Sequence, residues 1–425
     1  MRGLPWPLWI YRVLLPVYVL VAFPAWWVRM VRRGGWGVDL WERFAVYRGD
    51  AEFEPCGAVH VHAVSVGEAL LALKLIRAWR ERDGGARFVL AVATASAKRM
   101  LEGQVPEGVR LVYQPVDFRW AVRRYLDRFE PAQVVLVEGE MWPHLLLECE
   151  RRGLPVRLVN ARMSPRSKRR YSRLAFLVRP FFRHLDRVAV QEPEDAEIWE
   201  HLGVATGKIT VAGSMKFDPS GAVRGQQREE FRKMVDELGR GRRVVMAAST
   251  HAGEEKLLVD AIHAAGAFAV VVPRHAERRH EIAAELEQDG KKVVLRSRYE
   301  AVPGGAVLVV DSTGELKDWI EQVDLVIVGK SFLGTGGQNP AEAVMAGKAV
   351  VFGPHMENFE PLATSLVAAG GARRVAAGEL QAALTLLLAD DAAMARMVTA
   401  ARGVLSRHEG ATQRLLDLLG AGDAK

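Results

Sequence analysis

The sequence predicts an α/β protein with two domains of similar size, each built on a parallel sheet. Its 425 residues exceed what one ordinary hydrophobic core serves, so two domains are the expected division. Short, continuous apolar runs alternate with segments of helical spacing, which is typical of strands buried on both faces of a parallel sheet. The same alternation begins again after Gly213. Together these observations favour two α/β domains.

An apolar segment precedes the first domain. Residues 4–28 are almost entirely apolar or aromatic, interrupted only by Arg12 and followed by several arginines. Aromatic residues with a basic flank are typical of a membrane boundary. The segment contains four prolines, and the stretch between Arg12 and Arg29 is shorter than the ~20 residues of a clean span. We therefore expect residues 1–33 to form an anchor that spans marginally or lies in the interface, with the body on the cytoplasmic side of an inner membrane.

Two other interpretations of this segment stay open. A cleaved signal peptide is disfavoured, because no small-x-small cleavage site precedes the arginines. A buried core helix is the second alternative.

Six apolar runs are the expected strands of the first domain. They are rich in β-branched residues and are separated by helical segments such as residues 69–80. The runs are residues 58–64, 88–93, 109–113, 133–137, 156–159 and 187–190.

The second domain repeats this rhythm. Its expected strands are residues 243–247, 267–272, 292–295, 306–310, 325–328 and 349–352. From residue 376 the chain is rich in Ala and Leu and predicts helices. The join falls near 212–219, so the predicted domains are residues 34–211 and 212–425.

The composition bounds the partners and the compartment. The formal net charge of +7 favours anionic partners without choosing among nucleic acid, anionic lipid and phosphorylated substrate. The two cysteines, Cys56 and Cys149, lie far apart and outside any C-x-x-C pattern. This argues against a disulfide scaffold or a structural zinc site and fits a reducing cytoplasm.

Polar residues follow several expected strands of the first domain, and ligands of open parallel sheets bind beyond those carboxyl ends. Glu68 opens a helix directly after the first strand. From the residues alone, a carboxylate there is favoured as a charge that stabilises a helix N-terminus, and it is also placed to act as a base. Glu138 and Glu140 follow residues 133–137, and two acidic residues after a buried strand are costly unless they are solvated or paired. We expect a carboxylate that faces a cleft.

Two other features of this half have competing interpretations. His60 and His62 share one face of the first strand, but no third ligand is spaced to complete a metal site, so packed histidines are favoured. The basic run of residues 166–170 is either a solvated helix face or a contact for lipid phosphates.

In the second half, residues 249–254 suit either phosphate binding at a helix N-terminus or a simple N-cap. Arg274 stands at a strand end, where a fixed arginine suits phosphate or base recognition. The glycine-rich turn of residues 334–342 suits a phosphate against its backbone N–H groups and a ribose against Glu342.

Two nucleotide motifs are rejected. The Gly-Lys-Ser of residues 329–331 resembles the end of a P-loop motif. It is not one, because Asp324 occupies the position of the first glycine that the motif requires. Asn339 replaces the last glycine of a dinucleotide fingerprint. ATP and NAD are therefore disfavoured.

Eight motifs occur in an order that resembles one family over nearly the whole chain: HAVSVGE, VEGEMWP, NARMS-x-RS, AST-x-x-GE, PRH, TGEL, GGQNPAEA and FGPHMENF. This family is the Kdo transferases, which transfer 3-deoxy-D-manno-octulosonic acid (Kdo) from CMP-Kdo to lipid A precursors. The resemblance implies a GT-B fold, in which two Rossmann-like domains face a central cleft. The first domain would bind the acceptor and the second the donor.

The resemblance also implies roles for individual residues. Glu68 matches the family's general base, Glu138 matches a carboxylate that supports the transition state, and Lys216 in GSMKFD has a similar role. The segments that contact CMP match Pro273, Arg274, Gly314, Glu315, Leu316, Asn339, Pro340, Ala341 and Glu342. The chain departs from the family where Gln338 replaces a histidine and Ala343 replaces a proline, which bears on the fine geometry of the donor.

The expected function is inverting transfer of Kdo from CMP-Kdo to a lipid A precursor in lipopolysaccharide biosynthesis. No Asp-x-Asp metal site is present in the sequence, so neither a metal nor another cofactor is expected, and nucleic acid is not an expected partner. Two alternatives remain. One is another GT-B transferase or epimerase that uses a uridine-sugar nucleotide. The other is a non-catalytic, membrane-attached nucleotide-binding protein of envelope assembly.

Overall fold

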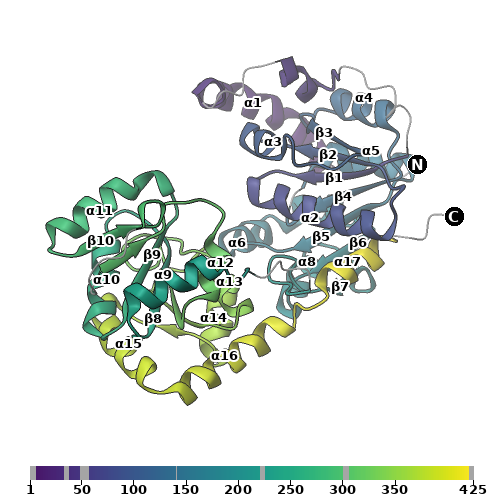
Figure 1. Cartoon of the computed structure of the whole chain (residues 1–425). Coiled ribbons are helices and arrows are strands. Elements are labelled where there is room, and N and C mark those ends of the chain that lie inside the picture. The colour runs from purple at the N-terminus through teal and green to yellow at the C-terminus, as the bar shows by residue number, and fades with distance from the viewer. Residues whose placement is uncertain are drawn as a thin grey trace. The chain divides into compact units, whose positions relative to one another are not determined.

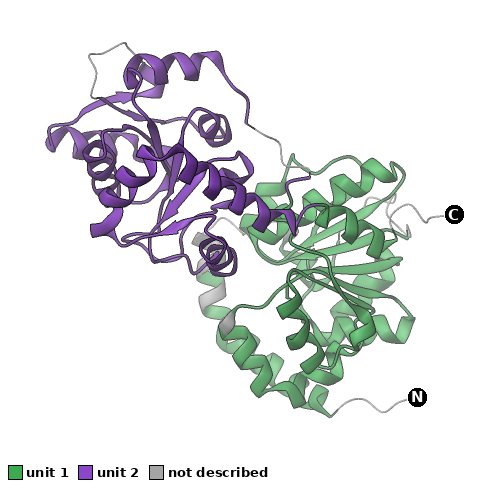
Figure 2. Cartoon of the chain, turned by 90° about the horizontal axis from the view of Figure 1, so that it is seen from below, with its two compact units in different colours: residues 1–218, 410–425 green, residues 219–409 purple. Residues whose placement is uncertain are grey.

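The computed structural model describes residues 6–32, 38–47, 57–139, 141–220, 225–299 and 306–420 (Figure 1). Arg33, Cys56 and Glu140 lie outside these ranges. The chain forms two compact units (Figure 2): unit 1 comprises residues 1–218 and 410–425, and unit 2 comprises residues 219–409.

Unit 1 contains a parallel sheet of seven strands in the order β3-β2-β1-β4-β5-β6-β7. Alternate residues of a strand enter different cores: Val134 and Leu136 pack in one hydrophobic cluster, and Val135 and Val137 pack in another. This two-sided burial explains the continuous apolar runs. The strands are β1 (Val59–Ala63), β2 (Phe88–Val92), β3 (Val109–Tyr113), β4 (Gln133–Val137), β5 (Val156–Ala161), β6 (Arg187–Val190) and β7 (Ile209–Val211).

The α-helices of unit 1 are α1 (Pro7–Arg32), α2 (Val66–Arg82), α3 (Ala95–Leu101), α4 (Arg119–Phe129), α5 (Pro143–Arg152), α6 (Pro165–Arg173), α7 (Ala175–Phe182), α8 (Pro193–His201) and α17 (Ala411–Leu419). Two 3₁₀ helices, η1 (Val38–Phe44) and η3 (Thr206–Lys208), accompany them. By length and composition, α1 could cross a membrane.

Unit 2 contains a second parallel sheet of seven strands, in the order β10-β11-β9-β8-β12-β13-β14. The strands are β8 (Val244–Thr250), β9 (Phe268–Pro273), β10 (Lys292–Leu295), β11 (Ala306–Val309), β12 (Leu325–Val328), β13 (Ala349–Phe352) and β14 (Arg373–Arg374). Its α-helices are α9 (Glu229–Gly239), α10 (Glu255–Ala264), α11 (Arg279–Gln288), α12 (Leu316–Glu321), α13 (Ala341–Met345), α14 (Glu360–Ala368), α15 (Leu380–Ala389) and α16 (Asp391–Ser406). Its 3₁₀ helices are η4 (Ala276–Arg278), η5 (Arg296–Arg298) and η6 (Ala377–Glu379).

Each of the twelve expected strands is present, and two further strands were not predicted. The additional strands, β7 and β14, are short and largely exposed, so they lack the apolar run that identifies a buried strand. Both pair at the edge of a sheet.

The division between the units differs from the predicted domain boundaries at both ends of the second domain. Unit 1 extends to Asp218 and resumes at Gly410. The last described helix, α17, buries Leu415 and Leu416 in the hydrophobic cluster that contains the buried side of α2. The join lies within the expected region of residues 212–219, although later than the predicted division at 211/212. Helices α15 and α16 belong to unit 2 as predicted, whereas α17 belongs to unit 1. The cause is tertiary, because an amphipathic pattern does not name the surface that a helix covers.

Candidate active site

Two of the predicted catalytic residues, Glu68 and Glu138, follow strands of unit 1 at the point where its strand order reverses. β1 and β4 are neighbours, while the chain runs from β1 towards β2 on one side and from β4 towards β5 on the other. Open parallel sheets bind ligands beyond the carboxyl ends of strands at such a point. Glu68 follows β1 and Glu138 follows β4, so both carboxylates belong to this position.

Glu68 is held by the turn that begins α2. The N-cap residue Ser65 accepts a hydrogen bond from the Glu68 N–H at 3.2 Å and donates one to Glu68 Oε1 at 2.8 Å. Glu68 Oε2 accepts from the Val64 N–H at 2.8 Å. This reciprocal cap explains the position of the carboxylate from local sequence. Each oxygen keeps a further lone pair, so the fixed carboxylate could still accept a proton.

Glu138 adopts a left-handed backbone conformation, with φ +67°, at the end of β4. Such strain in a non-glycine residue is common at functional sites. Arg162 Nε lies 4.0 Å from Glu138 Oε2. Burial raises the pKa of Glu138, and the charge of Glu68 raises it further, whereas Arg162 and Lys216 lower it. The charges of Glu68, Lys216 and Arg162 therefore all act on Glu138 within unit 1.

Asn160 supports this group and was not among the predicted site residues. It is fully buried in β5, has φ +53°, and its Oδ1 accepts a hydrogen bond from the Met215 N–H at 3.0 Å. Met215 precedes Lys216, and its carbonyl also accepts from Lys74 Nζ at 2.8 Å. Asn160 thus fixes the turn that carries Lys216. Its polar position after a strand was visible in the sequence, but its partner was not.

Unit 2 has an equivalent reversal point between β8 and β12, and a small pocket lies there. The pocket holds about 90 Å³, well below the roughly 300–1,000 Å³ of a complete ligand site, so it would take only part of a ligand such as one ring. Its lining is Ala248, Ser249, Arg274, Leu316, Ile320, Val326, Val328, Gln338, Asn339, Glu342 and Ala343.

Four of the residues predicted to contact the nucleotide line this pocket: Arg274, Leu316, Asn339 and Glu342. Gln338 and Ala343, the two departures from the family pattern, line it as well.

The other residues predicted to contact the nucleotide are close in sequence to residues that line the pocket. Pro273 is the buried last residue of β9, Gly314 has φ +82°, and Pro340 precedes α13. The Ala341 N–H donates to Asn339 Oδ1 at 3.1 Å. The Glu315 carboxylate is engaged elsewhere, because Arg296 Nε lies 3.1 Å and Arg228 Nη1 lies 3.6 Å from its oxygens.

Glu254 joins the loops that surround the pocket. Its Oε1 accepts hydrogen bonds from the His251 N–H at 2.9 Å and from the Lys330 N–H at 2.5 Å. The backbone at Ser249 and Lys330 is left-handed, with φ +55° and +56°. A Cβ at Gly329 would lie 2.6 Å from the Ser249 carbonyl oxygen, so only glycine permits this approach of the two loops. The sequence predicted a cap or phosphate site here and missed this bridging role.

His60 and His62 are core residues. Both are fully buried, and His60 Nδ1 lies 2.7 Å from the Tyr125 hydroxyl. Burial lowers the pKa of His60 and lowers that of His62 to about 4, so both are neutral at pH 7. Within the described part of the chain, no group of three or more His, Cys, Asp or Glu side chains could hold a metal ion.

Comparisons with known proteins identify the family and the fold of the chain. A family model for 3-deoxy-D-manno-octulosonic-acid transferase (kdotransferase) matches residues 39–219. A 3-deoxy-D-manno-octulosonic acid transferase of Bordetella pertussis is 36% identical over 416 residues, which cover 93% of this chain and 96% of that protein. One of Haemophilus influenzae is 29% identical and covers 89% and 90%. MurG of Acinetobacter baumannii, at 15% identity, aligns with 86% of this chain and 99% of its own with a TM-score of 0.55, which shows the GT-B fold. The chain belongs to the 3-deoxy-D-manno-octulosonic acid transferase family of glycosyltransferases.

Proposed function

We propose that this Kdo transferase moves Kdo from CMP-Kdo to a lipid A precursor with inversion at the anomeric carbon. The observation that carries the proposal is that Glu68 and Glu138 follow the neighbouring strands β1 and β4 at the reversal point of unit 1, with the charge of Lys216 acting on Glu138. An acceptor hydroxyl forms a bond to the anomeric carbon while the bond from that carbon to the phosphate oxygen breaks. Glu68 takes the hydroxyl proton, and CMP leaves with the bonding electrons.

Charge around the reacting carbon gives the other residues their roles. The transition state carries positive character on the sugar ring, which the Glu138 carboxylate would stabilise. Lys216 would stabilise the sugar carboxylate or the leaving phosphate. The cap around Glu68 fixes its carboxylate, so little reorganisation is needed when the proton moves.

Unit 2 supplies a suitable donor site. Arg274 lines the pocket and could pair with a phosphate oxygen, and Glu342 could accept hydrogen bonds from a ribose. The nearby apolar wall of Leu316, Ile320 and Val328 suits one face of a base. The proposal includes no metal or further cofactor, so transfer should persist in EDTA.

A lipid acceptor and membrane attachment fit two surfaces of unit 1. Helix α1 exposes large apolar side chains over most of its length. Helix α6 lines a hollow with Arg166, Arg169, Arg170 and Arg173, whose charges suit lipid phosphates. We place the body on the cytoplasmic side of the inner membrane, where nucleotide sugars are made available.

The test is direct transfer by the purified full-length chain. CMP-Kdo and a tetra-acylated lipid A precursor are supplied with EDTA, and the lipid product is analysed by mass spectrometry. An added Kdo mass, lost in Glu68→Gln with CMP binding retained by calorimetry, supports the proposal. Tighter binding of UDP than CMP, or unchanged turnover in Glu68→Gln, would contradict the proposed donor or the proposed base respectively.

A further inference from the structure

Within unit 1, the two ends of the segment from Tyr11 to Arg43 are bound to the adjacent residues Asp117 and Val116. The Tyr11 hydroxyl donates to Asp117 Oδ2 at 2.8 Å. The Val116 N–H donates to the Arg43 carbonyl at 2.8 Å. The start of α1 and the end of η1 are therefore fixed at neighbouring positions on the same face of unit 1.

Both ends of this segment are built into the core. At the first end, Leu8 is only 1% exposed, and the Tyr11 ring lies 5.3 Å from that of His144. At the second end, Glu42 Oε2 accepts from Lys98 Nζ at 3.0 Å and from the backbone of β3. Leu8 belongs to the same hydrophobic cluster as Ala45 and Tyr47 beyond η1.

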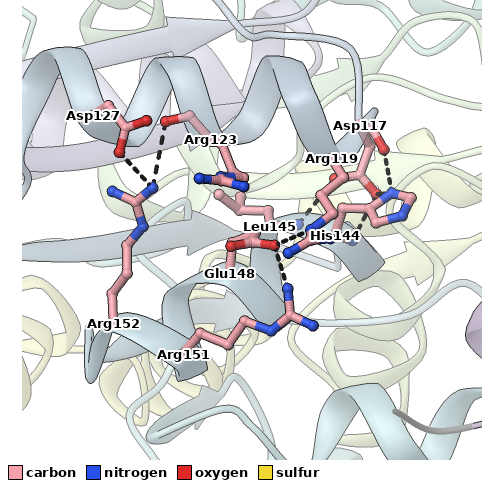
Figure 3. Close-up of polar contacts among 9 residues, drawn as sticks. All are labelled: Asp117, Arg119, Arg123, Asp127, His144, Leu145, Glu148, Arg151 and Arg152. Carbon is pink, nitrogen blue, oxygen red and sulfur yellow. Dashed lines mark hydrogen bonds and ion pairs between the residues drawn. The ribbon is translucent and has the colours of Figure 1, made fainter.

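Asp117 is the fixed point of the first end. Besides Tyr11, it accepts from the N–H groups of His144 and Leu145, both at 3.0 Å. Figure 3 shows Asp117 beside His144, with Glu148 between Arg119 and Arg151. The carboxylate thus ties α1 to the N-terminus of α5, which is part of the sheet domain.

Between its two fixed ends, α1 presents apolar side chains outward. Val13, Val17 and Val21, one helical turn apart, are 67%, 53% and 76% exposed. From Tyr11 to Arg32 the helix runs for about 32 Å, close to the thickness of a hydrocarbon layer. A contiguous apolar surface of this size requires a non-aqueous partner. Under the proposed function that partner is a lipid membrane.

The two fixed ends limit how α1 meets this membrane. A chain that leaves and returns on one side crosses the bilayer an even number of times. If α1 crossed once, residues 33–37 would have to cross back, because η1 is already part of unit 1. From residue 32 to residue 38 a fully extended chain reaches at most about 22 Å, which is less than the ~30 Å thickness of the hydrocarbon layer. A second crossing is therefore excluded.

We infer that α1 inserts into the membrane from the side of unit 1 and does not cross it, so that the N-terminus stays on the side of the catalytic units. The inference rests on the membrane attachment proposed above and resolves the alternatives left by the sequence in favour of an element bound to one leaflet. It needs no transfer activity.

Aromatic and basic side chains around the base of α1 match the chemistry of anionic lipid headgroups. Trp120 stacks with Phe44 beside the returning end, and Trp6 stacks with Phe176 beside the starting end. These rings are partly exposed. Such rings favour the boundary between headgroups and acyl chains.

Arginines accompany these rings. Arg119 and Arg151 pair with Glu148 at 2.7 and 2.6 Å while their side chains stay partly exposed. Burial and then their positive charges lower the pKa of Arg12, so Arg12 lies in the same cationic group. One negative charge against three positive ones leaves this surface attractive to anionic lipid.

The experiment uses the full chain with one epitope before Met1 and a different epitope after Lys425. It is expressed in a Gram-negative host, and protease is added to sealed inverted inner-membrane vesicles and to spheroplasts. We expect both epitopes to be removed in inverted vesicles and both to be protected in spheroplasts. Removal of both epitopes in detergent is the control for cleavage.

Protection of the first epitope in inverted vesicles, with removal of the second, would show a crossing helix and overturn the inference. A chain found entirely in the soluble fraction would overturn it too. If both epitopes lie on one side of the membrane but the chain transfers no Kdo, the proposed function is contradicted and this inference stands. The two ideas are therefore tested separately.

Discussion

Both units contain a parallel sheet of seven strands with a point where the strand order reverses, but different residues lie at that point in each unit. In unit 1 the carboxylates Glu68 and Glu138 follow the two strands at this point, and the charge of Lys216 acts on Glu138. Unit 2 places a pocket there with an arginine, a carboxylate and apolar walls around it. We propose that the reversal point serves catalysis in unit 1 and recognition of the donor in unit 2. The difference teaches that topology fixes where a ligand binds, while the residues at the strand ends decide what happens to it.

The sharpest test of this division is Glu68→Gln. Turnover should fall by ~100- to 10,000-fold because the positioned base is lost, while CMP affinity in unit 2 stays unchanged. Steady-state kinetics and calorimetry measure the two quantities. Glu81→Gln, an exposed change on the same helix, is the matched control. Equal loss in both variants would contradict a catalytic role for Glu68.

A pH series examines a buried carboxylate of unit 1. Burial raises the pKa of Asp117 from 3.8 to about 7, although the N–H groups of His144 and Leu145 and the Tyr11 hydroxyl lower it. The folded chain then holds this proton more tightly than the unfolded chain, so the free energy of unfolding should fall as the pH rises from about 4 to 7, by roughly 4 kcal/mol. Unfolding of the membrane-bound chain is measured across this range.

Asp117→Asn should flatten that pH dependence, since the titrating group is gone. Asp127→Asn is the control, because Asp127 pairs with Arg152 on the surface and is partly exposed (Figure 3). An unchanged slope in Asp117→Asn would assign the pH dependence to other groups.

Arg274→Gln addresses recognition in unit 2. A hydrogen bond between charged groups contributes about 1.5–3 kcal/mol, so CMP affinity should fall by roughly 10- to 150-fold. Calorimetry with CMP measures the loss, and Arg232→Gln on the exposed face of α9 is the control. Full affinity in Arg274→Gln would remove this residue from the donor site.

Glu254→Gln tests how the pocket is held. A glutamine oxygen accepts weaker hydrogen bonds from the His251 and Lys330 N–H groups than the carboxylate does. The free energy of unfolding should therefore fall by about 1–3 kcal/mol. The KM for the donor should rise more than kcat falls, because the loops shape binding rather than reaction. Glu287→Gln, exposed on α11, serves as control. A change in kcat alone would argue against this role.

Tyr11→Phe is the smallest expected change. It removes one hydrogen bond to Asp117, whose other donors remain, so the expected loss is about 0.5–1.5 kcal/mol. Limited proteolysis should cut the start of α1 faster, and exposed Tyr18→Phe should have no such effect. Identical proteolysis of both variants would show that this bond does not hold α1.

Local pattern sufficed for much of the fold. Buried parallel strands carry apolar runs long enough to identify, whereas β7 and β14 carry none and were missed. Glu68 was predicted by its place after a strand and by family resemblance, and the structure adds the cap that holds it.

The remainder depends on contacts between segments distant in sequence. Asn160 is hydrogen-bonded to Met215, 55 residues away in sequence, and Glu254 to Lys330, 76 residues away. Similarly, Tyr11 meets Asp117 across 106 positions. No periodicity or spacing in the sequence indicates such pairs. The supporting roles of Asn160 and Glu254 and the attachment of α1 are therefore seen only in the structure.

The chain enters unit 2 after Asp218 and comes back at Gly410, and Asp218 accepts hydrogen bonds from the Gly410 and Thr412 N–H groups at 3.0 and 2.8 Å. The return of the chain to unit 1 at Gly410 affects the order in which the two units can fold during synthesis on the ribosome. Residues 219–409, which form all of unit 2, are synthesised before α17 and can fold at that stage. Unit 1 cannot be completed until α17 is synthesised, although most of unit 1 is translated first. A nascent chain released before α17 would leave the apolar side of α2 uncovered, and a chaperone would have to shield it.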